Sequence, residues 1–107
     1  LGTSIAALGI TTNVPVTMAD ILGSALVATA KPIGIETTVD LMKPSGKQAV
    51  LEVAGKLKEK GAKVLVLACT GMSTIGVAQD IRKELGMRVV DPVVASGLFA
   101  WYATKEF

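Results

Sequence analysis

Cys69, the only cysteine of the chain, is the residue with the clearest capacity for chemistry. It follows a short apolar run, Val64 to Ala68, whose uninterrupted hydrophobicity is typical of a strand buried on both faces of a parallel sheet. Thr70 and Gly71 come next, and helical periodicity appears from Ile75 to Leu85. Cys69 is therefore predicted to lie at a strand-to-helix turn, which is where open α/β sheets bind their ligands.

The predicted turn favours two kinds of behaviour for this thiol. A thiol at a helix N-terminus feels the positive end of the helix dipole, which favours the thiolate, and a thiolate acts as a nucleophile or as a base toward a carbon acid. The backbone amides of Thr70, Gly71 and Met72 would face the same cavity and suit a carboxylate or enolate oxygen, and Gly71, which can adopt a positive φ, would let a ligand approach the backbone. A lone free cysteine is also commonly a small buried hydrophobe, and the pattern leaves both interpretations open.

The same turn also allows an interpretation without chemistry. Its residues, T-G-M-S-T from Thr70 to Thr74, resemble the loops with which flavodoxins surround a phosphate. Aromatic rings usually flank a flavin, but the four aromatic residues of this chain all fall in its last nine positions, and neither a G-x-G-x-x-G motif nor a P-loop lysine is present. We therefore expect no cofactor, and a phosphate- or carboxylate-binding module without catalysis is the alternative function.

Composition is typical of a globular, cytoplasmic domain. With 107 residues, half of them hydrophobic and 19% charged, the chain is long enough for one core and too short for two. No apolar run approaches the roughly 18 residues of a membrane span, and no secretory signal is evident, so neither a membrane nor an oxidising compartment is expected. Histidine is absent and no cysteine or carboxylate cluster replaces it, so we expect no metal site.

The net charge of +2 is small, and the lysines gather between Lys56 and Lys63. There they alternate with apolar residues near a predicted helix end, where cations are favoured. This distribution indicates a solvated face and not a nucleic-acid-binding surface.

Four strands and four helices that alternate along the chain are predicted to position these residues. The strands are expected at residues 4–10, 33–39, 64–68 and 87–90, and the helices at residues 17–30, 45–60, 75–85 and 93–105. Such alternation requires right-handed parallel crossovers with helices on both faces of the sheet. We therefore predict one α/β domain with a three-layer, doubly wound parallel sheet in the strand order 2-1-3-4, similar to flavodoxin-like and Rossmann-like folds.

In this fold each strand delivers polar residues to the same edge of the sheet. Convergence of polar groups at one edge predicts a binding site there. The residues concerned follow the carboxyl ends of the four predicted strands and are Thr11, Thr12 and Asn13, then Asp40, then Cys69 and Thr70, and finally Asp91.

Two segments carry a resemblance to a known family. The first is G-A-K-V-L-V-L-A-C-T-G-M-S, from Gly61 to Ser73, and the second is E-L-G-M-R-V-V-D-P-V-V-A, from Glu84 to Ala95. Together they resemble the second lobe of the aspartate/glutamate/hydantoin racemase superfamily, and the C-T-G form is similar to its hydantoin racemase and AroM-like branches, some of whose members are uncharacterised. The match extends over residues 49–100, and Gly9 to Thr12 stands where the lobe of the family begins with a strand and threonines.

The resemblance implies a two-lobed enzyme that needs no cofactor and holds a small anionic or carbonyl-containing substrate between its lobes. Each lobe supplies one cysteine. One thiolate removes the proton from the carbon next to a carboxylate or carbonyl, and the other thiol returns a proton to the opposite face. Cys69 would be one of these two groups.

The residues that the resemblance implies around the substrate all belong to the predicted edge. Thr70 and Gly71 would hold a substrate oxygen. Asp91 would contact the substrate or orient its loop. A carboxylate would be bound by Thr11, Thr12 and Asn13.

This sequence departs from the family in having no second cysteine and in starting at Leu1. We therefore expect residues 1–107 to be one α/β domain that forms the C-terminal lobe or a fragment of a two-lobed protein, without the second lobe and its cysteine. A single lobe is expected to be inactive as a racemase on its own. Its lobe-facing surface, together with the C-terminal aromatic residues, is expected to favour a homo-oligomer.

Overall fold

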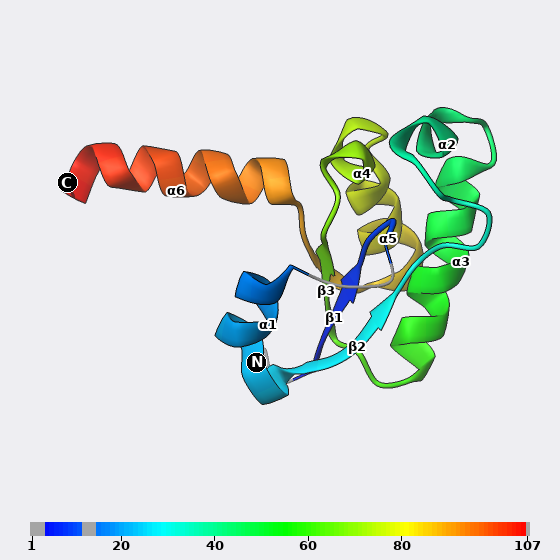
Figure 1. Ribbon diagram of the computed structural model, residues 1–107, viewed down its shortest axis with the longest axis horizontal. Coiled ribbons are helices and arrows are strands. Elements are labelled where there is room, and N and C mark those ends of the chain that lie inside the picture. The colour runs from blue at the N-terminus through cyan, green and yellow to red at the C-terminus, as the bar shows by residue number, and fades with distance from the viewer. Residues whose placement is uncertain (1–3, 12–14, 107) are drawn as a thin grey trace.

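A four-stranded, all-parallel sheet with the strand order β2-β1-β3-β4 forms the centre of the computed structural model, which describes residues 4–11 and 15–106 (Figure 1). The strands of this sheet are β1 (Ile5–Leu8), β2 (Leu26–Ala30), β3 (Val64–Leu67) and β4 (Arg88–Val90). The helices around it are α1 (Val16–Leu22), α2 (Thr38–Met42), α3 (Gly46–Glu59), α4 (Thr70–Thr74), α5 (Val77–Leu85) and α6 (Pro92–Glu106), with a 3-10 turn, η1 (Gly23–Ala25), before β2. The predicted α/β class and the strand order 2-1-3-4 are confirmed.

The register of the sheet brings the carboxyl ends of the strands to one edge. Leu8 at the end of β1 pairs with Ala30 of β2 and with Leu67 of β3, which are the last residues of those strands. β3 pairs in turn with β4, and Val66 lies opposite Val90. Because the strands are parallel, the segments that follow all four of them start at the same edge.

The core lies between the sheet and the two helices α3 and α5, which pack on the same face, whereas α1 lies on the other side (Figure 1). Alternate residues of the strands turn toward this core, among them Leu8 and Leu65, both fully buried. α3 meets them with an apolar stripe at the helical spacing i, i+3, i+4, i+7, made of Val50, Val53, Ala54 and Leu57. Burying one valine or leucine side chain contributes about 1.5–3 kcal/mol, so this layer is the main source of stability.

The lysines near the end of α3 lie on its solvated side, as predicted. One of them also has a structural role, because Lys58 Nζ donates a hydrogen bond to the carbonyl of Leu85 (2.6 Å) at the last turn of α5. A cation at this position is favoured by the helix dipole. The Lys58 side chain therefore links α3 to α5, the two helices that pack on the core face of the sheet.

The second strand begins earlier than predicted. The helix expected over residues 17–30 ends at Leu22, because Gly23 adopts φ +51°, and the last five residues of that range form β2. A short apolar segment fits both the helical and the strand period, and here the strand period prevails because β1 offers a hydrogen-bonding partner. In β2 the residues that are less exposed are Leu26, Ala28 and Ala30.

The strand predicted over residues 33–39 is wrong. The Ile35 amide donates to the Pro32 carbonyl (3.3 Å), and Gly34 adopts φ +83°, so the chain turns here. This turn buries Ile35 and leaves Ile33 exposed. The two isoleucines give the sequence the alternation that is typical of a strand, although the segment forms a turn. α2 then follows from Thr38.

The helix predicted over residues 75–85 is confirmed as α5, but a further helical turn precedes it. α4 begins at Thr70, directly after Cys69, and Gly76 in the left-handed conformation (φ +68°) separates α4 from α5. Gly71 lies inside α4. Gly71 does not adopt the positive φ that glycine allows, and the left-handed residue lies five positions further on, at Gly76.

α6 follows β4 as predicted and extends away from the rest of the molecule (Figure 1). Most of its side chains are exposed. Among the described residues, no helix is long and apolar enough to cross a membrane.

Gly46, the first residue of α3, offers a test of how tightly α2 packs against α3. A Cβ at this position would lie 2.7 and 2.8 Å from the backbone C and Cα atoms of Leu41, and backbone atoms cannot yield as a flexible side chain does. We predict that Gly46→Ala lowers the free energy of unfolding by about 2 kcal/mol or more, measured by urea denaturation.

Gly55→Ala is the matched control in the same helix. A Cβ there meets only Leu85 Cδ2, at 4.0 Å, so alanine is expected to raise the free energy of unfolding by about 0.5–1 kcal/mol through its better helix propensity. Equal stability changes for the two variants would contradict the close approach of α2 to α3.

Candidate active site at the carboxyl edge of the sheet

Cys69 lies at the strand-to-helix turn where it was predicted. The amide of Ala68 donates to the carbonyl of Leu8 (2.8 Å), which ties the end of β3 to the end of β1. Cys69 itself is extended (φ −142°, ψ 124°), and α4 starts at the next residue. Its thiol is free and half-buried, and the side chain packs against the rim of the core. The backbone just before Cys69 is therefore tied to the sheet, which places the thiol at this edge.

One of the three amides predicted to face a ligand already donates a hydrogen bond within the turn. The Met72 amide donates to the Cys69 carbonyl (3.1 Å), and the Met72 side chain is fully buried. Thr70, by contrast, is exposed at the start of α4. The part of the turn that remains for an oxygen of a ligand is thus limited to Thr70 and its neighbour Gly71.

Gly71 is required for close packing and not for an unusual backbone angle. A Cβ at this position would lie 3.0 Å from Leu41 Cδ1, 3.2 Å from Thr38 Cγ2 and 3.5 Å from Cys69 Sγ. Glycine therefore lets α2 approach α4 beside the thiol. Leu41 is buried, whereas Thr38 is exposed, so Thr38 forms part of the surface next to Cys69.

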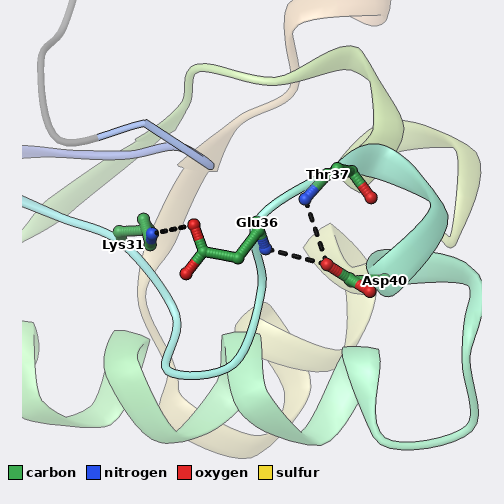
Figure 2. Close-up of polar contacts among 4 residues, drawn as sticks. All are labelled: Lys31, Glu36, Thr37 and Asp40. Atoms are coloured by element: carbon green, nitrogen blue, oxygen red, sulfur yellow. Dashed lines mark hydrogen bonds and ion pairs between the residues drawn. The ribbon is translucent and has the colours of Figure 1, made fainter.

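The position of α2 is set by polar contacts at its start, shown in Figure 2. Asp40 Oδ2 accepts hydrogen bonds from the amides of Glu36 (2.9 Å) and Thr37 (3.1 Å). Its other oxygen pairs with Lys43 (3.1 Å), which the figure does not draw. The hydrogen bond from the Glu36 amide, followed by those from Lys43 and Thr37, lowers the pKa of Asp40 to about 2. Asp40 was predicted to end the second strand, but it closes the N-terminus of α2 instead.

The residue that follows the true second strand is Lys31. Its ammonium group pairs with Glu36 Oε2 at 2.8 Å, and its side chain is only 24% exposed (Figure 2). Lys31 therefore takes the place at the edge that was predicted for Asp40. The lysine would have been identified if the strand period of residues 26–30 had been preferred to the helical one.

Asp91 links the end of β4 to two helices. Its Oδ1 accepts hydrogen bonds from Ser73 Oγ in α4 (2.8 Å) and from the amides of Val93 (2.9 Å) and Val94 (3.2 Å) in the first turn of α6. Burial raises the pKa of Asp91, but these hydrogen bonds outweigh it, so the pKa lies below its ordinary value. Asp91 thus caps α6 and fixes α4 at the same time.

The remaining predicted residues follow β1 in the sequence. Thr11 is exposed and lies beyond the end of β1, the strand that pairs with β3, and β3 leads to Cys69. Thr12 and Asn13 lie outside the described residues. Thr38 was not predicted, because its place beside the thiol depends on the packing of α2 and has no signal in the local sequence.

The fold and this edge define the class of protein. It is an α/β protein with a parallel sheet and a single cysteine at the turn after the third strand. A family model described as Asp/Glu/Hydantoin racemase matches residues 6–96, and the chain belongs to this family. The family resemblance noted in the sequence is thereby confirmed.

Two relatives are similar to parts of the chain. The hydantoin racemase of Pseudomonas sp. (strain NS671) is 35% identical over 65 residues, which are 61% of this chain and 22% of that protein. The solved structure of the allantoin racemase from Klebsiella pneumoniae superposes with a TM-score of 0.60 at 27% identity, over 83% of this chain and 38% of that one. The chain thus spans well under half the length of both relatives.

The low pKa of Asp40 makes stability depend on pH. Because the folded-state pKa of about 2 lies below the ordinary value of 3.8, the ionised carboxylate stabilises the fold above pH 3.8, and this contribution is lost as the pH falls through 2. We predict that Asp40→Asn is less stable than the unmodified chain at neutral pH and that the difference shrinks between pH 3.8 and 2. Urea denaturation over this range measures it, and a difference that does not change with pH would contradict the assignment.

The link between Asp91 and Ser73 predicts a measurable coupling. In a double-mutant cycle with Asp91→Ala and Ser73→Ala, we expect a coupling free energy of about 1 kcal/mol in thermal or urea unfolding, since the pair is partly buried and charge-assisted. Ser96→Ala is the matched control, because Ser96 Oγ bonds only to the Pro92 carbonyl within α6 in the described contacts (2.8 Å). Coupling of Asp91 to Ser96 as strong as that to Ser73 would contradict a specific link to α4.

Proposed function

We propose that this chain is one lobe of a cofactor-independent racemase in which Cys69 transfers a proton at a carbon next to a carboxylate or carbonyl. The observation that carries the proposal is the position of the thiol at the carboxyl edge, inside the segment that matches the racemase family. The substrate would be a small anionic or carbonyl-containing molecule. The names of the two relatives, a hydantoin racemase and an allantoin racemase, support this substrate class.

The proposed step is a proton transfer to the thiolate of Cys69. The C–H bond breaks, the S–H bond forms, and the electron pair of the C–H bond is delocalised onto the neighbouring carbonyl oxygen as an enolate. A hydrogen-bond donor beside that oxygen stabilises the charge. The exposed Thr70 and the adjoining backbone at Gly71 are proposed as that donor group.

The other residues have different proposed roles. Thr11, together with the next two residues of the sequence, Thr12 and Asn13, is proposed to bind a substrate carboxylate. Asp91 is proposed as a positioning residue, because its Oδ1 already accepts three hydrogen bonds that hold α4 and α6. Asp91 therefore acts on the thiol through α4 and not by touching the substrate.

Racemisation also requires a second acid on the opposite face of the planar carbanion. Cys69 is the only cysteine in these 107 residues, and we propose that a second lobe supplies the other one. The present chain is then one α/β lobe, with half of the proton-transfer pair. Such a lobe removes a proton and returns it to the same face.

This proposal predicts hydrogen exchange without racemisation. In D2O, one enantiomer of a hydantoin with a single substituent on the carbon next to the carbonyl is expected to exchange that hydrogen and to retain its optical rotation. NMR and polarimetry follow the two quantities. After the uncatalysed background rate is subtracted, the exchange rate is expected to be lower in Cys69→Ala by about 100-fold or more.

Thr74→Ala is the matched control in the same helix, because the Thr74 hydroxyl bonds to the Thr70 carbonyl (3.3 Å) and has no proposed part in proton transfer. It is expected to leave the exchange rate unchanged. Exchange that persists in Cys69→Ala would refute the role of the thiol. Binding of the hydantoin that Cys69→Ala does not affect, without any exchange, would favour the anion-binding module instead.

A further inference from the structure

We infer that Thr38 is a specificity-determining residue of the site at Cys69, because its methyl group limits the size of the substituent that a reacting molecule carries beside the thiol. The substrate class to which this limit applies rests on the proposed function. The steric limit itself rests on the way α2 packs against the turn at Gly71.

The methyl group of Thr38 and the sulfur of Cys69 border the same part of Gly71. A Cβ on Gly71 would lie 3.2 Å from Thr38 Cγ2 and 3.5 Å from Cys69 Sγ. The first distance is shorter than the roughly 3.5–4.0 Å of an ordinary carbon–carbon contact, so no further carbon atom fits between Gly71 and the methyl group. The Thr38 methyl group therefore closes the space beside the thiol on the side of α2.

Exposure distinguishes Thr38 from the other neighbours of this point. Leu41 Cδ1 lies 3.0 Å from the same position, but both Leu41 and Gly71 are buried. Thr38 is exposed, and Cys69 is half-buried. Of the side chains that surround this point, Thr38 is thus the one that a molecule coming from solvent meets next to the thiol.

The position of Thr38 is fixed by its own helix. Leu41, three residues further along α2, is only 1% exposed and belongs to the core. At the start of the helix, Asp40 accepts hydrogen bonds from the amides of Glu36 and Thr37 (Figure 2). Displacement of Thr38 away from the thiol would expose Leu41 to water or break these hydrogen bonds, and both changes are unfavourable.

This geometry narrows the substrate class. Proton transfer requires the reacting carbon to come within about 3–3.5 Å of the thiol sulfur of Cys69. The substituent on that carbon starts one bond further away, so a methyl group fits beside Thr38, whereas a benzyl group collides with it. The site is therefore assigned to carbonyl-containing carbon acids with a small substituent on the reacting carbon.

Two substitutions of Thr38 separate its methyl group from its hydroxyl group. Thr38→Ser removes the methyl group and keeps the hydroxyl, whereas Thr38→Val keeps a methyl group in this place and removes the hydroxyl. Hydrogen exchange in D2O is compared for two hydantoins that carry either a methyl or a benzyl substituent on the reacting carbon. Thr38→Ser is expected to raise the ratio of the benzyl rate to the methyl rate by about tenfold or more, and Thr38→Val is expected to leave this ratio unchanged.

Alkylation of the thiol measures the same limit without proton transfer from a substrate. Iodoacetamide and its N-phenyl derivative share the carbon that the sulfur attacks and differ in size, and Cys69 is the only thiol of the chain. Mass spectrometry follows both rates. Thr38→Ser is expected to raise the rate of the N-phenyl derivative relative to that of iodoacetamide by about threefold, since the bulky group lies further from the attacked carbon.

Thr37→Ser is the matched control. Serine at this position also removes one methyl group from the start of α2, and it preserves the side-chain cap of the helix. This variant is expected to leave both ratios unchanged. Circular dichroism establishes that each variant is folded.

The possible results distinguish the inference from the proposed function. Ratios that Thr38→Ser leaves unchanged would show that Thr38 does not border the path to the thiol. Ratios that change in Thr38→Val but not in Thr38→Ser would assign the contact to the hydroxyl group and overturn the steric limit. Absence of hydantoin exchange in every variant would refute the proposed proton transfer, and the alkylation rates would then decide on the steric limit alone.

Discussion

The burial of β1 is the constraint on which the rest of the structure depends. All four of its residues are buried, and two of them are alanines, so neighbouring elements approach its backbone closely on both faces. Its hydrogen bonds hold β2 on one side and β3 on the other in parallel register. Parallel strands need crossover connections, so every segment that follows a strand starts at the same edge. The place of Cys69 is therefore a consequence of burying one short apolar strand.

Two kinds of force hold the surroundings of the thiol. On one side, β3 and the core fix the backbone of Cys69 through burial. On the other side, α2 is attached by one buried leucine, Leu41, and by hydrogen bonds to Asp40 near the surface. Burial of apolar surface is the stronger of the two, so it contributes more to holding the site than the hydrogen bonds of Asp40 do.

The sequence patterns predicted the elements whose signals agree with one another. α3 and α5 combine an amphipathic period with a glycine after their last turn, and β3 is an uninterrupted apolar run, so all three lie where expected. β2 was misplaced because its few apolar residues fit two periods, and only pairing with β1 decides between them. Because of this error, Lys31 was not predicted at the edge of the sheet, and Asp40 was predicted there instead. Thr38 lies near the thiol because Gly71 lets α2 approach α4 closely. This is tertiary packing, and it leaves no pattern in the local sequence.

Two incomplete features of this molecule, the single proton-transfer group and the uncovered helix α6, start from the same edge of the sheet. Proton transfer at both faces of a planar carbanion needs groups on opposite sides, and one thiol at one edge reaches only one of them. α6, whose apolar side chains are uncovered, begins at that same edge, and Asp91 fixes its first turn to the helix that starts after Cys69. The first turn of α6 is therefore held at the same edge of the sheet as the thiol.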